Sequence, residues 1–151
     1  MRGTWKGKGF AQYPTIEDTE YEETLKFDFD MDYPIIHFEQ KVKLLPGNAV
    51  SHWESGFIKE TETGDLEMTN VQNNGRLEIL KGTVNSEKLK DNILEIEFNS
   101  VAFVNDPRMI KSQRIFTIEK NELNYVKFMS TTLTAKPQML KHLEAKLKRV
   151  D

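Results

Sequence analysis

The sequence of 151 residues contains no cysteine. Disulfide bonds, thiolate nucleophiles, iron–sulfur clusters and cysteine-based zinc sites are therefore excluded. Histidine is scarce as well, with only His37, His52 and His142. No apolar run approaches the ~18 residues of a membrane span, and the first residues lack the apolar core of a signal peptide. We therefore expect a cytoplasmic protein without a membrane partner.

The sequence also lacks an excess of positive charge. Its 21 lysines and arginines face 24 acidic residues, which gives a net charge of -3. The only cationic cluster is Lys141, Lys146, Lys148 and Arg149, which Glu144 interrupts, and we interpret it as a solvated face. A nucleic-acid partner is therefore not expected. A composition of 38% hydrophobic and 30% charged residues is typical of a globular protein, and the length fits one domain over residues 1–151.

The main pattern in the sequence is an alternation of side chains between the two faces of an extended segment. In residues 21–29, Tyr21, Glu23, Leu25, Phe27 and Phe29 share one face, which is the period of a strand. Turn sequences at residues 46–48, 63–65 and 73–75 separate similar segments. About nine such strands follow one another without a convincing helix. This pattern predicts an all-β antiparallel sandwich or barrel.

The last stretch, residues 136–150, is ambiguous. Its leucines lie at helical spacing, but Leu143, Ala145 and Leu147 also alternate with polar residues as in a strand. The local pattern favours a helix. A closed meander, however, needs a final strand if no edge is to stay unpaired. We therefore predict a tenth strand here.

Several short motifs occur in a fixed order along the chain. They are GTWKGKG at residues 3–9, YPTI at 13–16, HWESGF at 52–57, NG at 74–75, GT at 82–83, ELNY at 122–125 and HLEAKLKR at 142–149. In this order they resemble the nitrobindin family, heme-binding β-barrels related to fatty-acid-binding proteins. The resemblance covers nearly the whole chain. It implies a ten-stranded antiparallel up-and-down barrel of the calycin, lipocalin-like, type with heme b at one end.

The resemblance also implies site residues. The family's iron ligand is the histidine of a closing His-Leu-x-Ala motif, which corresponds to His142. Its pocket wall includes residues that correspond to His52 and Gln72. Family members bind ferric heme, react with nitric oxide and isomerise peroxynitrite to nitrate. An imidazole is the usual axial ligand when the opposite face of a heme iron must stay open. The implied function is therefore a heme protein that handles reactive nitrogen species, with possible peroxynitrite isomerase activity.

Taken residue by residue, the chain leaves alternatives open. Without the family resemblance, His142 is interpreted as a surface residue. His52 is then a hydrogen-bonded residue of the barrel mouth, and Gln72 caps the adjacent turn. The same barrel could instead carry a fatty acid or another small apolar ligand, with Arg114 or Tyr125 holding its carboxylate. The sequence does not decide which face of that strand is inside. Only the heme function requires His142 in its motif.

Overall fold

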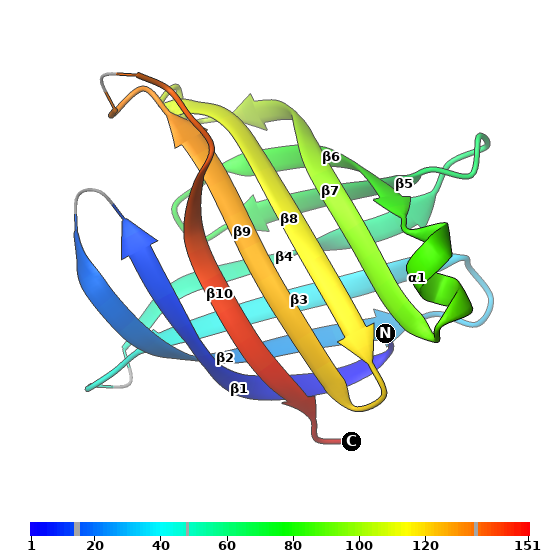
Figure 1. Ribbon diagram of the computed structural model, residues 1–151. Helices are drawn as coiled ribbons and strands as arrows, with labels where there is room; N and C mark the ends of the chain where they lie inside the picture. Colours follow the sequence, from blue (N-terminus) through cyan, green and yellow to red (C-terminus); the bar gives the residue numbers. More distant parts are fainter. Residues whose placement is uncertain (14–15, 48, 135) are drawn as a thin grey trace.

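The computed structural model describes residues 1–13, 16–47, 49–134 and 136–151. Each strand pairs antiparallel with its sequence neighbour, and β1 pairs with β10 to close a barrel (Figure 1). The strands are β1 (Gly3–Tyr13), β2 (Ile16–Phe29), β3 (Ile35–Leu44), β4 (Val50–Glu60), β5 (Leu66–Gln72), β6 (Leu77–Val84), β7 (Ile93–Val104), β8 (Met109–Glu119), β9 (Glu122–Thr131) and β10 (Leu140–Arg149). The ten-stranded up-and-down barrel predicted from the sequence is confirmed, and the ambiguous last stretch is a strand.

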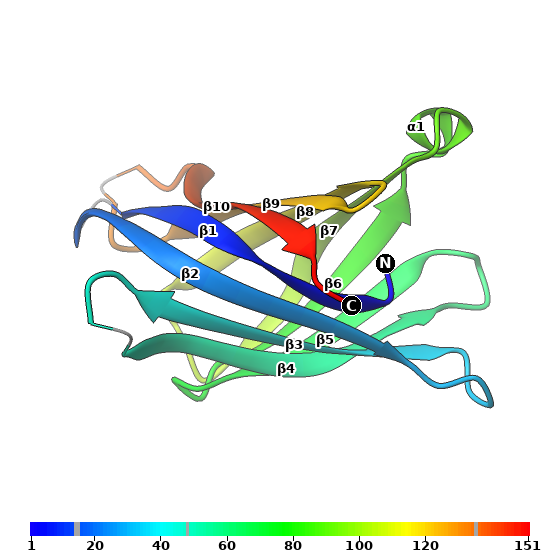
Figure 2. The ribbon, with the colours of Figure 1, turned by 90° about the horizontal axis from the view of Figure 1, so that it is seen from below.

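One short helix, α1 (Ser86–Lys90), lies between β6 and β7, where the sequence pattern predicts none. The side chain of Asn85 caps it by accepting hydrogen bonds from the backbone N–H groups of Glu87 and Lys88. Five residues are too few to produce a helical period in the sequence. The helix lies at the barrel end opposite the β9–β10 connection (Figures 1 and 2). Among the described residues, no helix is long and apolar enough to cross a membrane.

The glycines of β1 let this strand lie close to its neighbours. A Cβ atom on Gly7 would lie 2.0 Å from the backbone carbonyl oxygen of Lys146, and one on Gly9 would lie 2.2 Å from the Tyr21 ring. Tyr21 is fully buried, and its hydroxyl donates to the carbonyl of Glu144 on β10 at 3.2 Å. The first motif of the sequence therefore helps to close the barrel, because it lets β1 lie close to β10 and lets the Tyr21 side chain of β2 reach β10 across β1.

The barrel interior has an apolar part and a polar part. The apolar core includes Trp5, Phe27, Phe38, Phe98, Phe116 and Leu147. Nearer the end that carries the β9–β10 connection, consecutive strands point polar side chains inward. The buried members of this layer are Glu23, Gln40, Glu54, Asn70, Gln72, Glu78, Ser112, Arg114 and Lys127. Burying a polar group costs free energy unless it is hydrogen-bonded, so the contacts within this layer constrain the residues above it.

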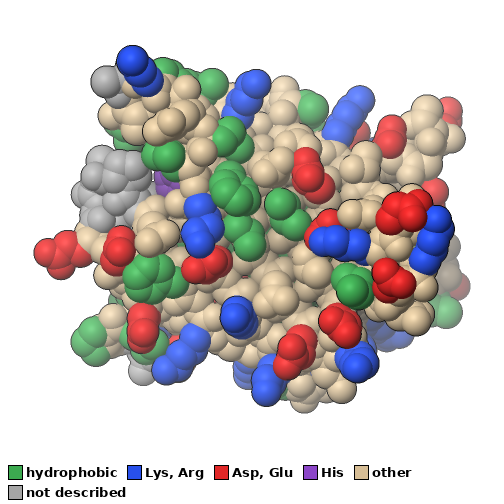
Figure 3. Space-filling model, viewed as in Figure 1, with side chains coloured by type: hydrophobic (Ala, Val, Ile, Leu, Met, Phe, Trp, Pro, Cys, Tyr) green, Lys and Arg blue, Asp and Glu red, His purple; other side chains and the backbone are tan. Residues whose placement is uncertain are grey.

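The outer surface carries both signs of charge. On the face seen in Figure 3, basic and acidic side chains are interspersed around a patch of hydrophobic ones. Lys141, Lys146 and Lys148 are exposed on β10, and Lys141 pairs with Glu144 at 2.8 Å. The cationic cluster of the sequence is therefore a solvated face, as predicted.

Candidate functional site

A cavity of about 250 Å³ opens at the polar end of the barrel. Its walls come from β4, from the β5–β6 turn, from the β7–β8 connection and the start of β8, and from β9, β10 and the segment between them. The lining residues are His52, Asn74, Arg76, Asp106, Arg108, Met109, Met129, Thr131, Leu133, Thr134 and His142. The segment between β9 and β10 contributes Leu133 and Thr134 to this wall, so the connection that precedes His142 builds part of the cavity.

An irregularity in β10 turns His142 toward the cavity. Lys141 pairs with Phe128 of β9 and Leu143 pairs with Lys127, so His142 is an extra residue without a partner position in the ladder. Strict alternation would place His142 and Leu143 on opposite faces, but both are buried. A β-bulge of this kind reorients one side chain at the end of a ladder and is common beside active sites. The bulge therefore puts an imidazole into the cavity wall.

The local contacts of His142 define its chemical state. Its Nδ1 lies 2.9 Å from the carbonyl oxygen of Leu140, a geometry in which Nδ1–H donates. Burial lowers the pKa of the imidazole, with the nearby charges of Lys127 and Arg76 acting in the same direction and the Leu140 contact opposing them. At neutral pH the ring is therefore neutral. With the proton on Nδ1, the lone pair resides on Nε2, which is the arrangement of a metal-ligating histidine.

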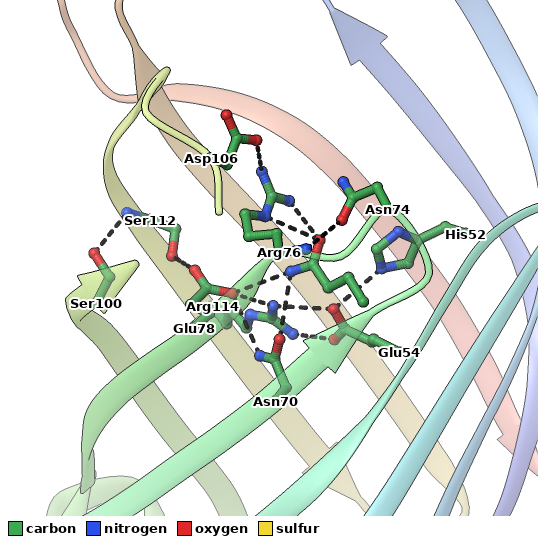
Figure 4. Close-up of polar contacts among 11 residues, drawn as sticks. His52, Glu54, Asn70, Asn74, Arg76, Glu78, Ser100, Asp106, Ser112 and Arg114 are labelled. Atoms are coloured by element: carbon green, nitrogen blue, oxygen red, sulfur yellow. Dashed lines mark hydrogen bonds and ion pairs between the residues drawn. The ribbon is translucent and has the colours of Figure 1, made fainter. Parts of the chain in front are cut away.

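His52 is held from below by a chain of buried ion pairs (Figure 4). Its Nε2 donates to Oε2 of Glu54 at 3.1 Å, and Glu54 accepts two hydrogen bonds from the guanidinium of Arg114. Arg114 also donates to Glu78, whose second oxygen accepts from Ser112. Burial opposes ionisation of Glu54, yet Arg114 outweighs it and holds the pKa of this carboxyl well below its ordinary value. A charged network thus fixes the His52 imidazole.

A second cluster, centred on Arg76, adjoins this network, because Nε2 of Gln72 donates to Glu78 at 3.5 Å (Figure 4). Its Nε and Nη2 donate to Oε1 of Gln72 at 3.0 and 2.6 Å, and its Nη1 donates to Asp106 at 3.3 Å. Asp106 also accepts from Nε and Nη2 of Arg108 at 2.9 and 3.0 Å. Arg76 is 8% exposed and lines the cavity. It comes directly after the tight turn at residues 73–75, and this position places its side chain at the barrel mouth.

Lys127 is a further buried cation, on the inner face of β9. It lies two residues before Met129, which lines the cavity, and opposite Leu143, the residue after the β10 bulge. It is 2% exposed, and its ammonium makes no hydrogen bond or ion pair with the residues that the structure describes. Burial, with Arg114 as the second cause, lowers the pKa of Lys127 to about 8. It is therefore mostly charged at neutral pH.

The family model described as THAP4-like, heme-binding beta-barrel domain matches residues 1–149. The chain belongs to the nitrobindin family. Peroxynitrite isomerase Rv2717c of Arabidopsis thaliana is 32% identical over 147 residues, which cover 97% of this chain and 85% of that protein. Peroxynitrite isomerase 2 of Mycobacterium marinum is 29% identical over 128 residues, covering 83% of this chain and 77% of that protein. The crystal structure of Rv2717c from M. tuberculosis has the same fold, with a TM-score of 0.87, 24% identity, and coverage of 99% and 92% of the two chains.

Two of the three site residues predicted for this nitrobindin lie together. His142 and His52 both line the cavity. Gln72 is buried behind it, and its amide reaches the cavity only through Arg76. Their roles toward heme stay predictions. Sequence analysis missed Arg76 and Asp106, and the only available indication was the position of Arg76 directly after a tight turn.

Arg114, a candidate of the apolar-ligand alternative, and His37, the remaining histidine, both have structural roles. Arg114 points inward and is fully buried, and its charge is already matched by Glu54 and Glu78. It is therefore not available for the carboxylate of a carried fatty acid. His37 is half-buried on the outer wall, where its Nε2 lies 2.8 Å from the Ser55 hydroxyl.

Proposed function

We propose that this chain binds heme b through His142 and isomerises peroxynitrite to nitrate in the cavity at the open end of the barrel. The observation that carries the proposal is the bulge-directed, neutral imidazole of His142 in the wall of that cavity. Membership of a heme-binding family and similarity to proteins named peroxynitrite isomerase support it. The same site would also accept nitric oxide. The cytoplasmic location stays a prediction.

The cavity residues fit a heme. Met109, Met129 and Leu133 offer apolar and polarisable contacts of the kind that suit the face of a porphyrin. His142 supplies a neutral nitrogen ligand whose orientation is fixed by the Leu140 carbonyl. The buried network below the cavity prevents His52 from rotating away, because Glu54 can move only if it breaks its pairing with Arg114. The chain therefore provides one iron ligand and one anchored imidazole at the same cavity.

The proposed reaction needs no co-reactant. Peroxynitrite and nitrate contain the same atoms and carry the same charge, so no electron or proton has to enter. When bound, ferric heme supplies a Lewis acid that polarises the peroxo bond. His142 would hold that group, and the cavity walls would keep the ligand beside it. His52 stays oriented through Glu54 and forms part of the cavity wall beside the ligand.

The test is peroxynitrite decay measured by stopped-flow absorbance, with nitrate quantified in the product. We expect hemin-loaded wild-type protein to accelerate decay to nitrate beyond an equal concentration of free hemin. His142→Ala should lose this acceleration. His37→Ala is the matched control, because it removes a histidine from the outer wall and should retain full activity. Equal activity of the His142 variant and the wild type would refute the proposal.

A further inference from the structure

Arg76 is the feature of the cavity that the proposed function leaves unused. Its guanidinium has five N–H donors. Three of them donate to Gln72 and Asp106. The other two, one on Nη1 and one on Nη2, have no acceptor among the residues that the structure describes. A buried guanidinium that lines a cavity with unused donors is suited to bind an anion there.

The charge balance of the cavity wall also favours an anion. The charged residues in its wall are Arg76, Arg108 and Asp106, and Asp106 is shared by the two arginines, which leaves an excess of one positive charge. Lys127 is a second buried cation nearby, and its charge and that of Arg114 together offset the two buried carboxylates of Glu54 and Glu78, so the excess positive charge is that of the cavity wall. Both Arg76 and Lys127 act electrostatically on His142. An anion beside His142 would therefore gain attraction that a neutral ligand would not.

We propose that Arg76 is the anion-recognition residue of this cavity, with Gln72 and Asp106 as its positioning residues. The ligand chemistry is a small oxyanion or carboxylate, and it has two sources: a propionate of the heme or a small anionic ligand that enters beside it. The proposal rests on the proposed function for the identity of the cavity's occupant. Gln72, which the family resemblance assigns to the pocket wall, thereby acts through Arg76.

Absorbance titrations separate the two sources. Wild type and Arg76→Met are titrated with hemin and with hemin dimethyl ester, which lacks the propionate charges. The hemin-loaded proteins are then titrated with azide, an anion, and with imidazole, a neutral ligand. Arg76→Met should lower the hemin-to-ester affinity ratio if a propionate is bound, or the azide-to-imidazole ratio if a small anion is bound. The expected loss is about tenfold or more, as for a charge-assisted hydrogen bond.

Lys111→Met is the matched control, because Lys111 is an exposed cation on β8. It should change neither ratio. Arg76→Lys keeps the charge but cannot reproduce the planar fork of donors, so we expect it to change the same ratio by several-fold. It also replaces Arg76→Met in the comparison if circular dichroism shows that the methionine variant does not fold.

A third measurement needs neither heme nor a variant. Nitrite is titrated into the wild-type apoprotein while the NMR signal of the Arg76 Nε–H is followed, with chloride at equal ionic strength as the control. A saturable shift with nitrite alone supports anion recognition even if hemin fails to bind, an outcome that would remove only the proposed function. Unchanged affinity ratios together with no saturable shift would overturn the role of Arg76 and leave it a structural residue.

Discussion

Replacement of Arg114 by methionine tests the polar layer beneath the site most severely. Methionine is of similar length and apolar, so the variant removes one charge without opening a large space. Glu54 and Glu78 are 1% and 0% exposed in their side chains and would stay buried without their shared cation. Removing one partner of a buried ion pair costs about 3–5 kcal/mol. Domains have ~5–15 kcal/mol of stability in total, so the loss is a large fraction.

The assay is urea and thermal unfolding followed by circular dichroism. At this chain length, 1 kcal/mol shifts Tm by about 2–4 °C, so we expect Arg114→Met to melt roughly 6–20 °C below the wild type. Lys111→Met, the exposed control on the same strand, should stay within about 0.5 kcal/mol. The triple variant Glu54→Gln, Glu78→Gln and Arg114→Met should recover part of the loss, because the two buried carboxylates that lost their cation are then replaced by neutral amides.

The pH dependence of the Arg114 variant follows from the same contacts. In the wild type, burial opposes ionisation but Arg114 keeps the pKa values of Glu54 and Glu78 below the ordinary value of 4.5, so their pairing stabilises the fold above that pH and is lost in acid. In Arg114→Met, burial alone acts and raises both pKa values. The stability deficit should therefore be largest near pH 7 and shrink toward pH 4. A deficit below about 1 kcal/mol, or one independent of pH, would refute the reasoning.

Two further predictions concern other parts of the barrel. Gly7→Ala should lower the free energy of unfolding in urea by about 1–3 kcal/mol, because the added Cβ would lie 2.0 Å from the Lys146 carbonyl oxygen. Lys6→Ala, at an exposed position of the same strand, should leave the free energy of unfolding unchanged, and equal stabilities of the two variants would contradict this prediction. Burial raises the pKa of Glu23 to about 7 from 4.5, so its ionisation weakens the fold as pH rises between these values. Glu23→Gln should thus match the wild type at pH 4 and exceed it by about 3 kcal/mol at pH 8; an equal difference at both pH values would rule this out.

The fold could be predicted because the chain alternates and turns regularly. In β2, Tyr21, Glu23, Leu25 and Phe27 all point inward as the pattern indicates. The short helix α1 escaped prediction because a single turn has no period. The decision between helix and strand for the last stretch depended on closing the barrel rather than on local preference.

The site was less predictable, for two physical reasons. His142 would lie on the outer face if the alternation of Leu143, Ala145 and Leu147 continued, and only the bulge in β10 reverses this. The second reason is the polar interior. On β6, Leu77 and Ile79 face outward while Glu78 is buried, so hydrophobicity does not identify the inner face there. Arg114 was ambiguous for the same reason, and Arg76 was not predicted at all.

The most direct test of the central claim is a hemin titration of the apoprotein. The account predicts that the wild type binds one hemin per chain with a shifted Soret band. His142→Ala should lose this band or weaken binding by about tenfold or more, since the iron loses its only protein ligand proposed here. Arg114→Met is not suited to this test, because it also destabilises the polar layer below the cavity. His37→Ala is the control and should bind hemin as the wild type does. Unchanged hemin affinity and an unchanged Soret band in His142→Ala would contradict the account.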